Sequence, residues 1–268
     1  MTNPNPAANT DPYLKRTQSG GLLTLSLNRG SSFNPLSSSM IAALENTFDQ
    51  VVGDSSVRVI VLRGEGRGFC AGHDLRELRD FGDDAARQRQ LFDSCSRMMV
   101  KLAKLPQPVI ARVHGIATAA GCQLVSMCDL AVADDSARFG MPGVNIGLFC
   151  STPAVGVARN IGRKRAMEML LTGDTIDAAT ALAWGLINRV VVLEKLDEEV
   201  QRFADRILAR SGAAIALGKG AFYSQIESGL TGAYGVAGAA MTSNLQLDDA
   251  AEGIDAFLTK RAPQWRNS

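Results

Sequence analysis

The chain has 268 residues, of which 46% are hydrophobic, and a formal net charge of +1 at pH 7. This length and composition are typical of a globular protein with a sizeable core. The charge balance shows no basic excess, which argues against a nucleic-acid partner. Because no apolar run approaches the roughly 20 residues of a membrane span, we expect no membrane partner either.

The first segment, residues 1–12, is rich in Asn, Pro and Ala and is expected to be a disordered lead. It has neither the apolar run of a secretory signal nor the Arg-rich character of a mitochondrial transit peptide. The five cysteines are odd in number and match no zinc spacing, and with only two histidines a metal site lacks ligands. We interpret the thiols as reduced and buried, and we predict a cytoplasmic protein.

The following part of the chain alternates predicted strands and helices. Short apolar runs predict strands over residues 22–28, 57–62, 109–113 and 130–133. Apolar residues at helical spacing predict a helix over 36–52, and a polar helix is expected over about 84–104, ended by two prolines. This alternation predicts an α/β protein with a parallel sheet and a ligand at the carboxyl ends of its strands.

From residue 196 onward the sequence predicts helices with no strand between them. The helical segments are 196–208, 213–226, 233–247 and 250–260. We therefore divide the chain into the lead 1–12, an α/β core over 13–195 and a helical region over 196–268. The small-residue-rich helices are expected either to mediate oligomerisation or to cap their own domain.

The segment after the second predicted strand carries the first chemical signal. Residues 64–75 read Gly-Glu-Gly-Arg-Gly-Phe-Cys-Ala-Gly-His-Asp-Leu. Glycines at this density bring the backbone close to a partner, and free N–H groups at the mouth of a sheet can stabilise an oxyanion. A flexible surface loop is the alternative. The spacing fits neither a dinucleotide-binding nor a P-loop pattern, which disfavours a nucleotide-phosphate site.

A second signal lies in residues 113–130, where a predicted strand runs into small residues that open a helix. The first N–H groups of a helix have no partner inside it and lie at its positive end. An oxygen that gains negative charge would be stabilised there. Close packing of helix on sheet through alanine and glycine is the alternative.

Both segments resemble the crotonase (enoyl-CoA hydratase/isomerase) superfamily. Residues 69–75 resemble its first oxyanion-hole segment, and residues 114–129 resemble its pattern N-G-x-A-x-G-G-G-x-x-L-x-x-x-C-D. Further matches at 27–36, 139–142, 172–186 and 252–263 extend the resemblance over nearly the whole chain. It implies an α/β crotonase (ClpP-like) fold of β-β-α repeats. It also implies a C-terminal helical region that forms trimers, or dimers of trimers.

The resemblance also implies a site for an acyl-CoA. The backbone N–H groups of His73 and Ala120 would hold the thioester oxygen, with Ala120 standing where the family usually has glycine. Other positions that the resemblance places around the substrate are Arg29, Ala71, Gly72, Gly121, Cys150, Phe257 and Lys260. Coenzyme A would enter as part of the substrate, and no metal, nicotinamide or flavin is implied.

Two positions depart from the family pattern. Hydratases of the family carry glutamates where this chain has Gln123 and Gly143. Glutamine cannot exchange a proton at neutral pH, and glycine contributes only backbone. Three hypotheses remain: an enzyme that stabilises an enolate with other groups, for example an acyl-CoA decarboxylase; an acyl-CoA binder without turnover; and a hydratase with non-standard acid and base groups. A role for the imidazole ring of His73 also stays open.

Overall fold

A six-stranded sheet forms the centre of the protein, and the structure, a computed structural model, describes residues 12–266. Neighbouring strands lie in the order β1 (Leu14–Ser19), β2 (Leu22–Leu27), β3 (Val59–Gly64), β4 (Val109–Val113), β6 (Leu130–Asp134) and β9 (Arg189–Val191). β1 and β2 pair antiparallel, and the other neighbours in this sheet are parallel. The parallel pairing agrees with the predicted alternation of strands and helices.

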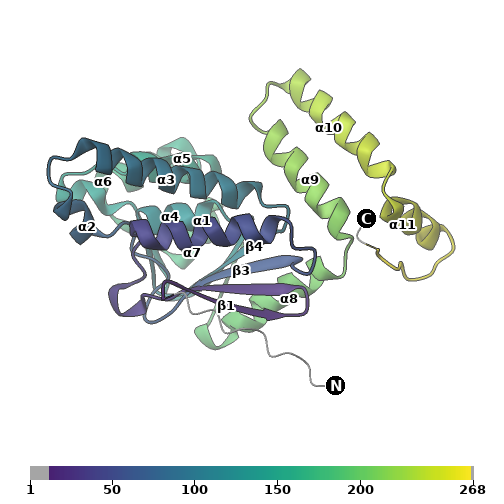
Figure 1. Cartoon of the computed structure of the whole chain (residues 1–268), viewed down its shortest axis with the longest axis horizontal. Helices are drawn as coiled ribbons and strands as arrows, with labels where there is room; N and C mark the ends of the chain where they lie inside the picture. The colour runs from purple at the N-terminus through teal and green to yellow at the C-terminus, as the bar shows by residue number, and fades with distance from the viewer. Residues whose placement is uncertain (1–11, 267–268) are drawn as a thin grey trace.

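Different helices cover the two faces of the sheet. Successive residues of a strand point to opposite faces, so neighbouring residues of one strand pack against different helices. Ile60 and Leu62 of β3 belong to the main hydrophobic core, which also holds the apolar side of α1 (Ser38–Val52). Val61 packs on the opposite face with α8 (Leu196–Leu208). β3 and β4 are thus buried on both faces, which explains their nearly uninterrupted apolar sequences. Figure 1 shows α1 and α8 on opposite sides of the sheet.

A smaller sheet lies beside the first and contains β5 (Ile116–Thr118), β7 (Arg138–Gly140) and β8 (Thr175–Asp177), in that order. The remaining helices of the core are α2 (Leu75–Asp80), α3 (Ala85–Lys104), α4 (Ala120–Ser126), α5 (Ser151–Asn160), α6 (Arg163–Thr172) and α7 (Ala178–Trp184). The side chain of Asp84 caps α3 by accepting from the N–H groups of Ala86 and Arg87. β5 leads directly into α4, so the small sheet positions the first residues of that helix.

Three further helices extend from the core, and we call residues 212–258 the C-terminal arm (Figure 1). They are α9 (Gly212–Gln225), α10 (Leu230–Leu245) and α11 (Asp248–Leu258). α9 and α10 pack along each other, and neither contains a buried residue. The predicted boundary at residue 196 falls at the start of α8, yet α8 packs on the sheet. The helices that leave the core begin with α9.

The predicted lead, residues 1–12, lies outside the described residues except for Pro12. All four predicted strands and both predicted helices of the core are present, with ends that differ by a few residues at most. Within residues 12–266 no helix combines the length and the apolar character needed to cross a membrane.

Candidate active site

The two predicted oxyanion-hole segments lie side by side. Cys70 forms a parallel bridge with Ala117 of β5, and the N–H of Thr118 donates to the carbonyl of Cys70 over 3.0 Å. Gly72 lies so close to the start of α4 that an ideal Cβ on it would be 3.2 Å from the nitrogen of Ala120. The φ of Gly72 is +99°, a conformation that also favours glycine.

The N–H groups of His73 and Ala120 have no acceptor within residues 12–266. His73 bridges with Leu36, but there the N–H of Leu36 donates to the carbonyl of Gly72, which leaves the N–H of His73 outside the pairing. Ala120 is the first residue of α4, where an N–H has no partner inside the helix. Two unpaired donors on adjacent segments are the arrangement that an oxyanion hole requires.

A strained turn before α4 directs the start of this helix toward the segment that contains His73. Ala119, the residue before the helix, has φ +49° and ψ −121°, a conformation that costs an alanine about 1–3 kcal/mol. Its N–H donates to the carbonyl of Gly140 over 2.8 Å, which holds the turn to β7. At the second residue of α4, an ideal Cβ on Gly121 would lie 2.1 Å from the carbonyl oxygen of Cys70. Only glycine allows α4 to approach the first segment this closely.

Asn34 positions the glycine-rich segment, and the sequence analysis did not identify it as a site residue. Its side chain is fully buried, and its Nδ2 lies 2.9–3.0 Å from the carbonyl oxygens of Glu65, Gly68 and Phe69. Its Oδ1 accepts from the N–H of Arg29 over 2.9 Å. An asparagine in a loop ordinarily forms only local turn hydrogen bonds, so its residue type did not suggest this role. Its place in the Phe-Asn-Pro-Leu segment that matches the family was the one feature of the sequence that could have drawn attention to it.

A cavity of about 520 Å³ adjoins the two amides. His73, Ala119 and Ala120 contribute to its wall, and so does Ala71. Most of the remaining wall is apolar, formed chiefly by Leu75, Leu78, Phe92, Ile146, Leu148 and Phe149. No Asp, Glu, Lys or Arg side chain belongs to this wall. The cavity therefore suits an uncharged, largely apolar group next to an oxygen held by the two N–H groups.

The imidazole ring of His73 is held in this wall. Its Nδ1 lies 3.1 Å from the carbonyl oxygen of Leu36, and its plane meets the ring of Phe92 edge-on, with centroids 5.4 Å apart. Its Nε2 is buried and has no hydrogen-bond partner. Burial lowers the pKa of His73, opposed by the hydrogen bond to Leu36 and by the charge of Glu77.

The two positions at which the family carries glutamates lie in different surroundings. Gln123 on α4 is only 4% exposed, does not belong to the cavity wall, and its Oε1 has no hydrogen-bond partner. Gly143 does line the cavity. An ideal Cβ on Gly143 would lie 2.6 Å from the carbonyl oxygen of Leu148 and 2.8 Å from Sγ of Cys150. The loop as folded therefore leaves no room for a side chain at 143.

Cys150 lines the same cavity, and burial raises the pKa of its thiol. Burial also raises the pKa of the neighbouring Cys122 thiol to about 12. Both thiols are thus protonated at neutral pH and are poor nucleophiles. Within residues 12–266 no group of three or more His, Cys, Asp or Glu side chains is arranged to hold a metal ion.

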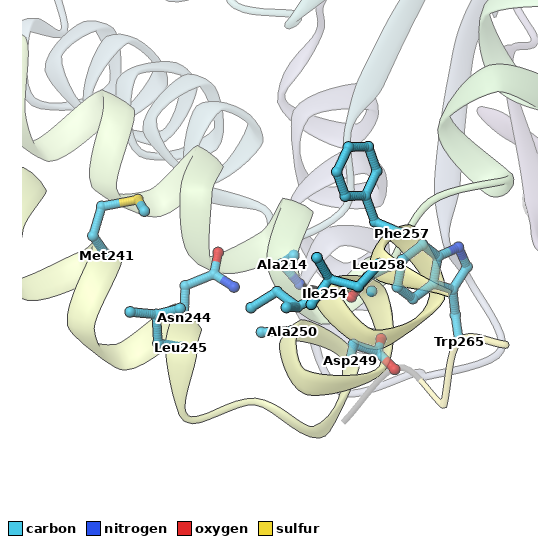
Figure 2. A pocket seen from close by; sticks show the side chains of 12 residues that line it. Ala214, Met241, Asn244, Leu245, Asp249, Ala250, Ile254, Phe257, Leu258 and Trp265 are labelled. Carbon is cyan, nitrogen blue, oxygen red and sulfur yellow. Dashed lines mark hydrogen bonds between the residues drawn. The ribbon is translucent and has the colours of Figure 1, made fainter. Parts of the chain in front are cut away.

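The remaining predicted residues lie elsewhere in the chain. Arg29 is not in the cavity wall; its guanidinium lies over the ring of Tyr13, 5.3 Å from the centroid. Phe257 belongs to α11, is 83% exposed, and lines a separate cavity of about 450 Å³ in the C-terminal arm. Figure 2 shows its ring standing clear of its neighbours in that cavity. Lys260 follows α11 and is likewise exposed, and neither residue lines the cavity beside His73 within one chain.

Comparison with known proteins agrees with this geometry. A family model described as enoyl-CoA hydratase/isomerase matches residues 17–268. The mitochondrial enoyl-CoA hydratase domain-containing protein 3 of Xenopus laevis is 43% identical over 97% of this chain and 90% of the relative. A probable enoyl-CoA hydratase of Mycobacterium leprae, echA8, is 35% identical over 91% of this chain and 93% of the relative.

Solved structures show the same agreement. An enoyl-CoA hydratase of Mycobacterium smegmatis is similar with a TM-score of 0.93 and 50% identity, over 95% of this chain and 99% of the other. Human enoyl-CoA hydratase domain-containing protein 3 is similar with a TM-score of 0.91 and 43% identity, over 94% of this chain and 100% of the other. The chain belongs to the enoyl-CoA hydratase/isomerase family, and the predicted crotonase fold is confirmed.

One prediction is wrong. The vertebrate relatives of about 43–44% identity are named as mitochondrial proteins, which contradicts the cytoplasmic location predicted from the sequence. That prediction rested on reduced cysteines and on the composition of residues 1–12. Reduced thiols are compatible with more than one compartment, so they could not decide between them.

Proposed function

We propose that the chain binds an acyl-CoA and holds its thioester oxygen between the N–H groups of His73 and Ala120. Coenzyme A is part of the substrate in this proposal. The observation that carries it is the pair of unpaired N–H groups beside an apolar cavity. One donor of this kind typically contributes about 2.7–4 kcal/mol to the stability of a transition state with a charged oxygen. The reaction class is therefore one that passes through a thioester enolate, as part of acyl-CoA metabolism.

The cavity wall favours a neutral acyl group. A carboxylate on the substrate would lie in an apolar cavity without Lys or Arg to pair with it, which is costly. This makes the decarboxylation of a malonyl-type thioester less favourable than chemistry on an uncharged acyl chain.

Hydration by the mechanism of two glutamates is disfavoured by Gln123 and Gly143. Restoring an acid at 143 would also displace the carbonyl of Leu148 or the thiol of Cys150. The alternative of a non-catalytic binder is supported by the lack of any carboxylate in the cavity wall. A hydratase with other acid and base groups is the third alternative. Loss of crotonyl-CoA absorbance with the purified protein distinguishes the last alternative from the others.

We also propose a homo-oligomer, a trimer or a dimer of trimers, assembled through the C-terminal arm. The support is the exposure of large apolar residues on the arm, such as Leu230 and Tyr234. A partner arm lying over the core of another copy could bring Phe257 and Lys260 to that copy's acyl-CoA.

The oxyanion hole is tested by comparing butyryl-CoA with S-butyl-CoA, a thioether without the carbonyl oxygen. Isothermal titration calorimetry is expected to show at least tenfold tighter binding of the thioester, which corresponds to about 1.4 kcal/mol. Ala120→Pro removes one N–H at the first helical position, where proline is compatible with a helix. The preference for the thioester is expected to fall in Ala120→Pro and to persist in Ala120→Gly.

Two results would contradict this proposal. One is the absence of saturable binding of either ligand to the wild-type protein. The other is equal affinity for thioester and thioether. Retained binding of the thioether by Ala120→Pro serves as the control that the cavity of that variant is intact.

A further inference from the structure

We propose that Nε2 of His73 is the base that removes the α-proton of a bound acyl-CoA, so that the protein exchanges this proton with solvent. The inference rests on the proposed function, because it needs a thioester whose oxygen is held at the N–H groups of His73 and Ala120. It assigns the imidazole ring a catalytic role in addition to the binding role of the backbone of the same residue.

The first step of the argument concerns the tautomer. Nδ1 of His73 lies 3.1 Å from the carbonyl oxygen of Leu36. A carbonyl oxygen only accepts, so Nδ1 must carry the proton and donate it. In the neutral ring, the lone pair is then on Nε2, which makes Nε2 a proton acceptor. The backbone of Leu36 is itself fixed by its N–H bond to the carbonyl of Gly72.

The second step concerns the missing partner. Nε2 is buried and accepts no hydrogen bond from any described residue. A buried acceptor left unpaired costs about 1–3 kcal/mol, and such atoms are rare in folded proteins. His73 belongs to the wall of the apolar cavity. An unpaired acceptor on a residue of the cavity wall points to a ligand that brings the proton.

The third step concerns reach. The α-carbon of a thioester is bonded to the carbonyl carbon and is therefore two bonds from the oxygen. If the N–H of His73 holds that oxygen, the α-proton lies within a few ångströms of the same residue. A base on the side chain of the oxyanion-hole residue is consequently well placed for this proton, as general base catalysis requires.

The fourth step concerns protonation. Burial lowers the pKa of His73, so the ring is neutral at pH 7 and able to accept a proton. Glu77 of α2 is the charged group that acts on the ring, and it opposes this lowering. No Asp, Glu, Lys or Arg lines the cavity with His73. Burial raises the pKa of the Cys150 thiol in the same wall, so the thiol is not a competing base.

The step is balanced without a further reactant. The electron pair of the α C–H bond moves into the enolate, whose oxygen is held by the two N–H groups, and the proton bonds to Nε2. The imidazolium then exchanges its proton with solvent and returns one to the α-carbon. In D₂O, the net result is replacement of hydrogen by deuterium in an otherwise unchanged acyl-CoA.

The experiment follows this replacement by proton NMR of phenylacetyl-CoA, whose α-protons are more acidic than those of a saturated chain. The full-length wild-type protein is expected to catalyse exchange, with a rate that falls in acid below the pKa of His73. His73→Asn removes Nε2 but retains a side-chain amide able to donate to Leu36, as well as the backbone N–H. Its exchange rate is expected to fall by about 10²–10⁴-fold, a far larger change than the change in the Kd for phenylacetyl-CoA.

The other histidine provides a control for the pH profile, and the acid limb is expected to persist in His114→Asn. Nitrogen-15 NMR of the wild-type protein is expected to show an unprotonated Nε2 at pH 7. Exchange that survives in His73→Asn would overturn the role of the ring and leave the oxyanion hole intact. Binding of the thioester without exchange by the wild type would overturn this inference alone. Absence of thioester binding would overturn the proposed function itself.

Discussion

The core and the C-terminal arm place their apolar residues in opposite ways. In the core, side chains as large as Phe48 and Phe139 are fully buried, whereas on the arm Leu230 is 76% exposed. Burying a side chain of this size stabilises a protein by about 1.5–3 kcal/mol relative to leaving it exposed. The core therefore accounts for the fold of a single chain. The apolar surface of the arm contributes comparably only when another molecule covers it.

The glycines show the same difference and give the largest expected effect. A Cβ added to Gly121 in the core would collide with the carbonyl of Cys70, whereas nothing lies within 4 Å of a Cβ on Gly220 of α9. We expect Gly121→Ala to destabilise the protein by about 3 kcal/mol and to abolish acyl-CoA binding. Gly220→Ala, the matched change in the arm, is expected to stabilise by about 0.5–1 kcal/mol. Urea unfolding measures the change in stability of both variants. Similar changes would contradict the distinction between a closely packed core and an open arm.

The junction between the two regions is a buried ion pair. Asp129 accepts from Nζ of Lys219 over 2.6 Å, from the hydroxyl of Tyr223 over 3.0 Å and from the N–H of Val109 over 2.7 Å. The Lys219 side chain is only 8% exposed. Asp129→Asn would leave this ammonium buried without a counter-charge, with only its hydrogen bond to the carbonyl of Gln107 over 3.0 Å certain to remain, at a cost of about 3 kcal/mol in the free energy of unfolding.

A matched control for the junction is available at the surface. Arg159 and Glu227 form an exposed pair at 3.0 Å that also connects the core with the arm. Glu227→Gln is expected to leave the urea midpoint nearly unchanged, because solvent screens exposed pairs. If both variants shift the midpoint equally, burial is not what makes the junction strong.

The apolar surface of α10 gives the third prediction. The double variant Leu230→Asp/Tyr234→Asp is expected to lower the sedimentation mass from that of an oligomer to that of one chain, with an unchanged circular dichroism spectrum. Both side chains are exposed in the single chain, so little folding energy is lost. Val100→Asp, at an exposed apolar position of core helix α3, is the control and is expected to retain the oligomer. A wild-type protein that sediments as one chain would contradict the prediction.

The two regions also differ in what the sequence reveals. β3 and β4 were predicted because strands buried on both faces read as continuous apolar runs. β1, with the sequence LKRTQS, is a polar edge strand and gave no such pattern. β5, β7, β8 and β9 have three residues each, too few to show a period of two. These short strands form through tertiary contacts that no local pattern expresses.

The site was predictable to the extent that its groups belong to the backbone. The resemblance to the crotonase superfamily, carried by the glycine-rich segment around His73 and the small residues before Ala120, pointed to both N–H groups. The central role of Asn34 was not visible, because it depends on three carbonyls that lie more than thirty residues away in sequence. The unpaired Nε2 of His73 was equally hidden, since a hydrogen-bond inventory exists only after folding.

The smallest expected effect concerns the tail that follows α11, residues 261–266. Glu252 accepts from Nη1 of Arg261 over 2.6 Å and from the N–H of Gln264 over 2.7 Å. These bonds, that of Arg261 first, hold the pKa of Glu252 at about 2, below its ordinary value near 4.5. Because the folded pKa is the lower one, the stabilising effect is complete above pH 4.5 and is lost as the pH falls toward 2.

Trp265 reports on this loss, because its Nε1 donates to the carbonyl of Ala209 over 2.9 Å when the tail is docked. In a Trp184→Phe background, which removes the other tryptophan, its emission is expected to shift between pH 4.5 and 2. Adding Arg261→Gln removes the bond that lowers the pKa most, so the shift is expected to begin at higher pH. Far-UV circular dichroism separates undocking from acid unfolding of the core. The effect is small because Glu252 and Arg261 lie at the surface. Emission that stays constant to pH 2 would contradict this prediction and would mean that apolar contacts of Trp265 hold the tail.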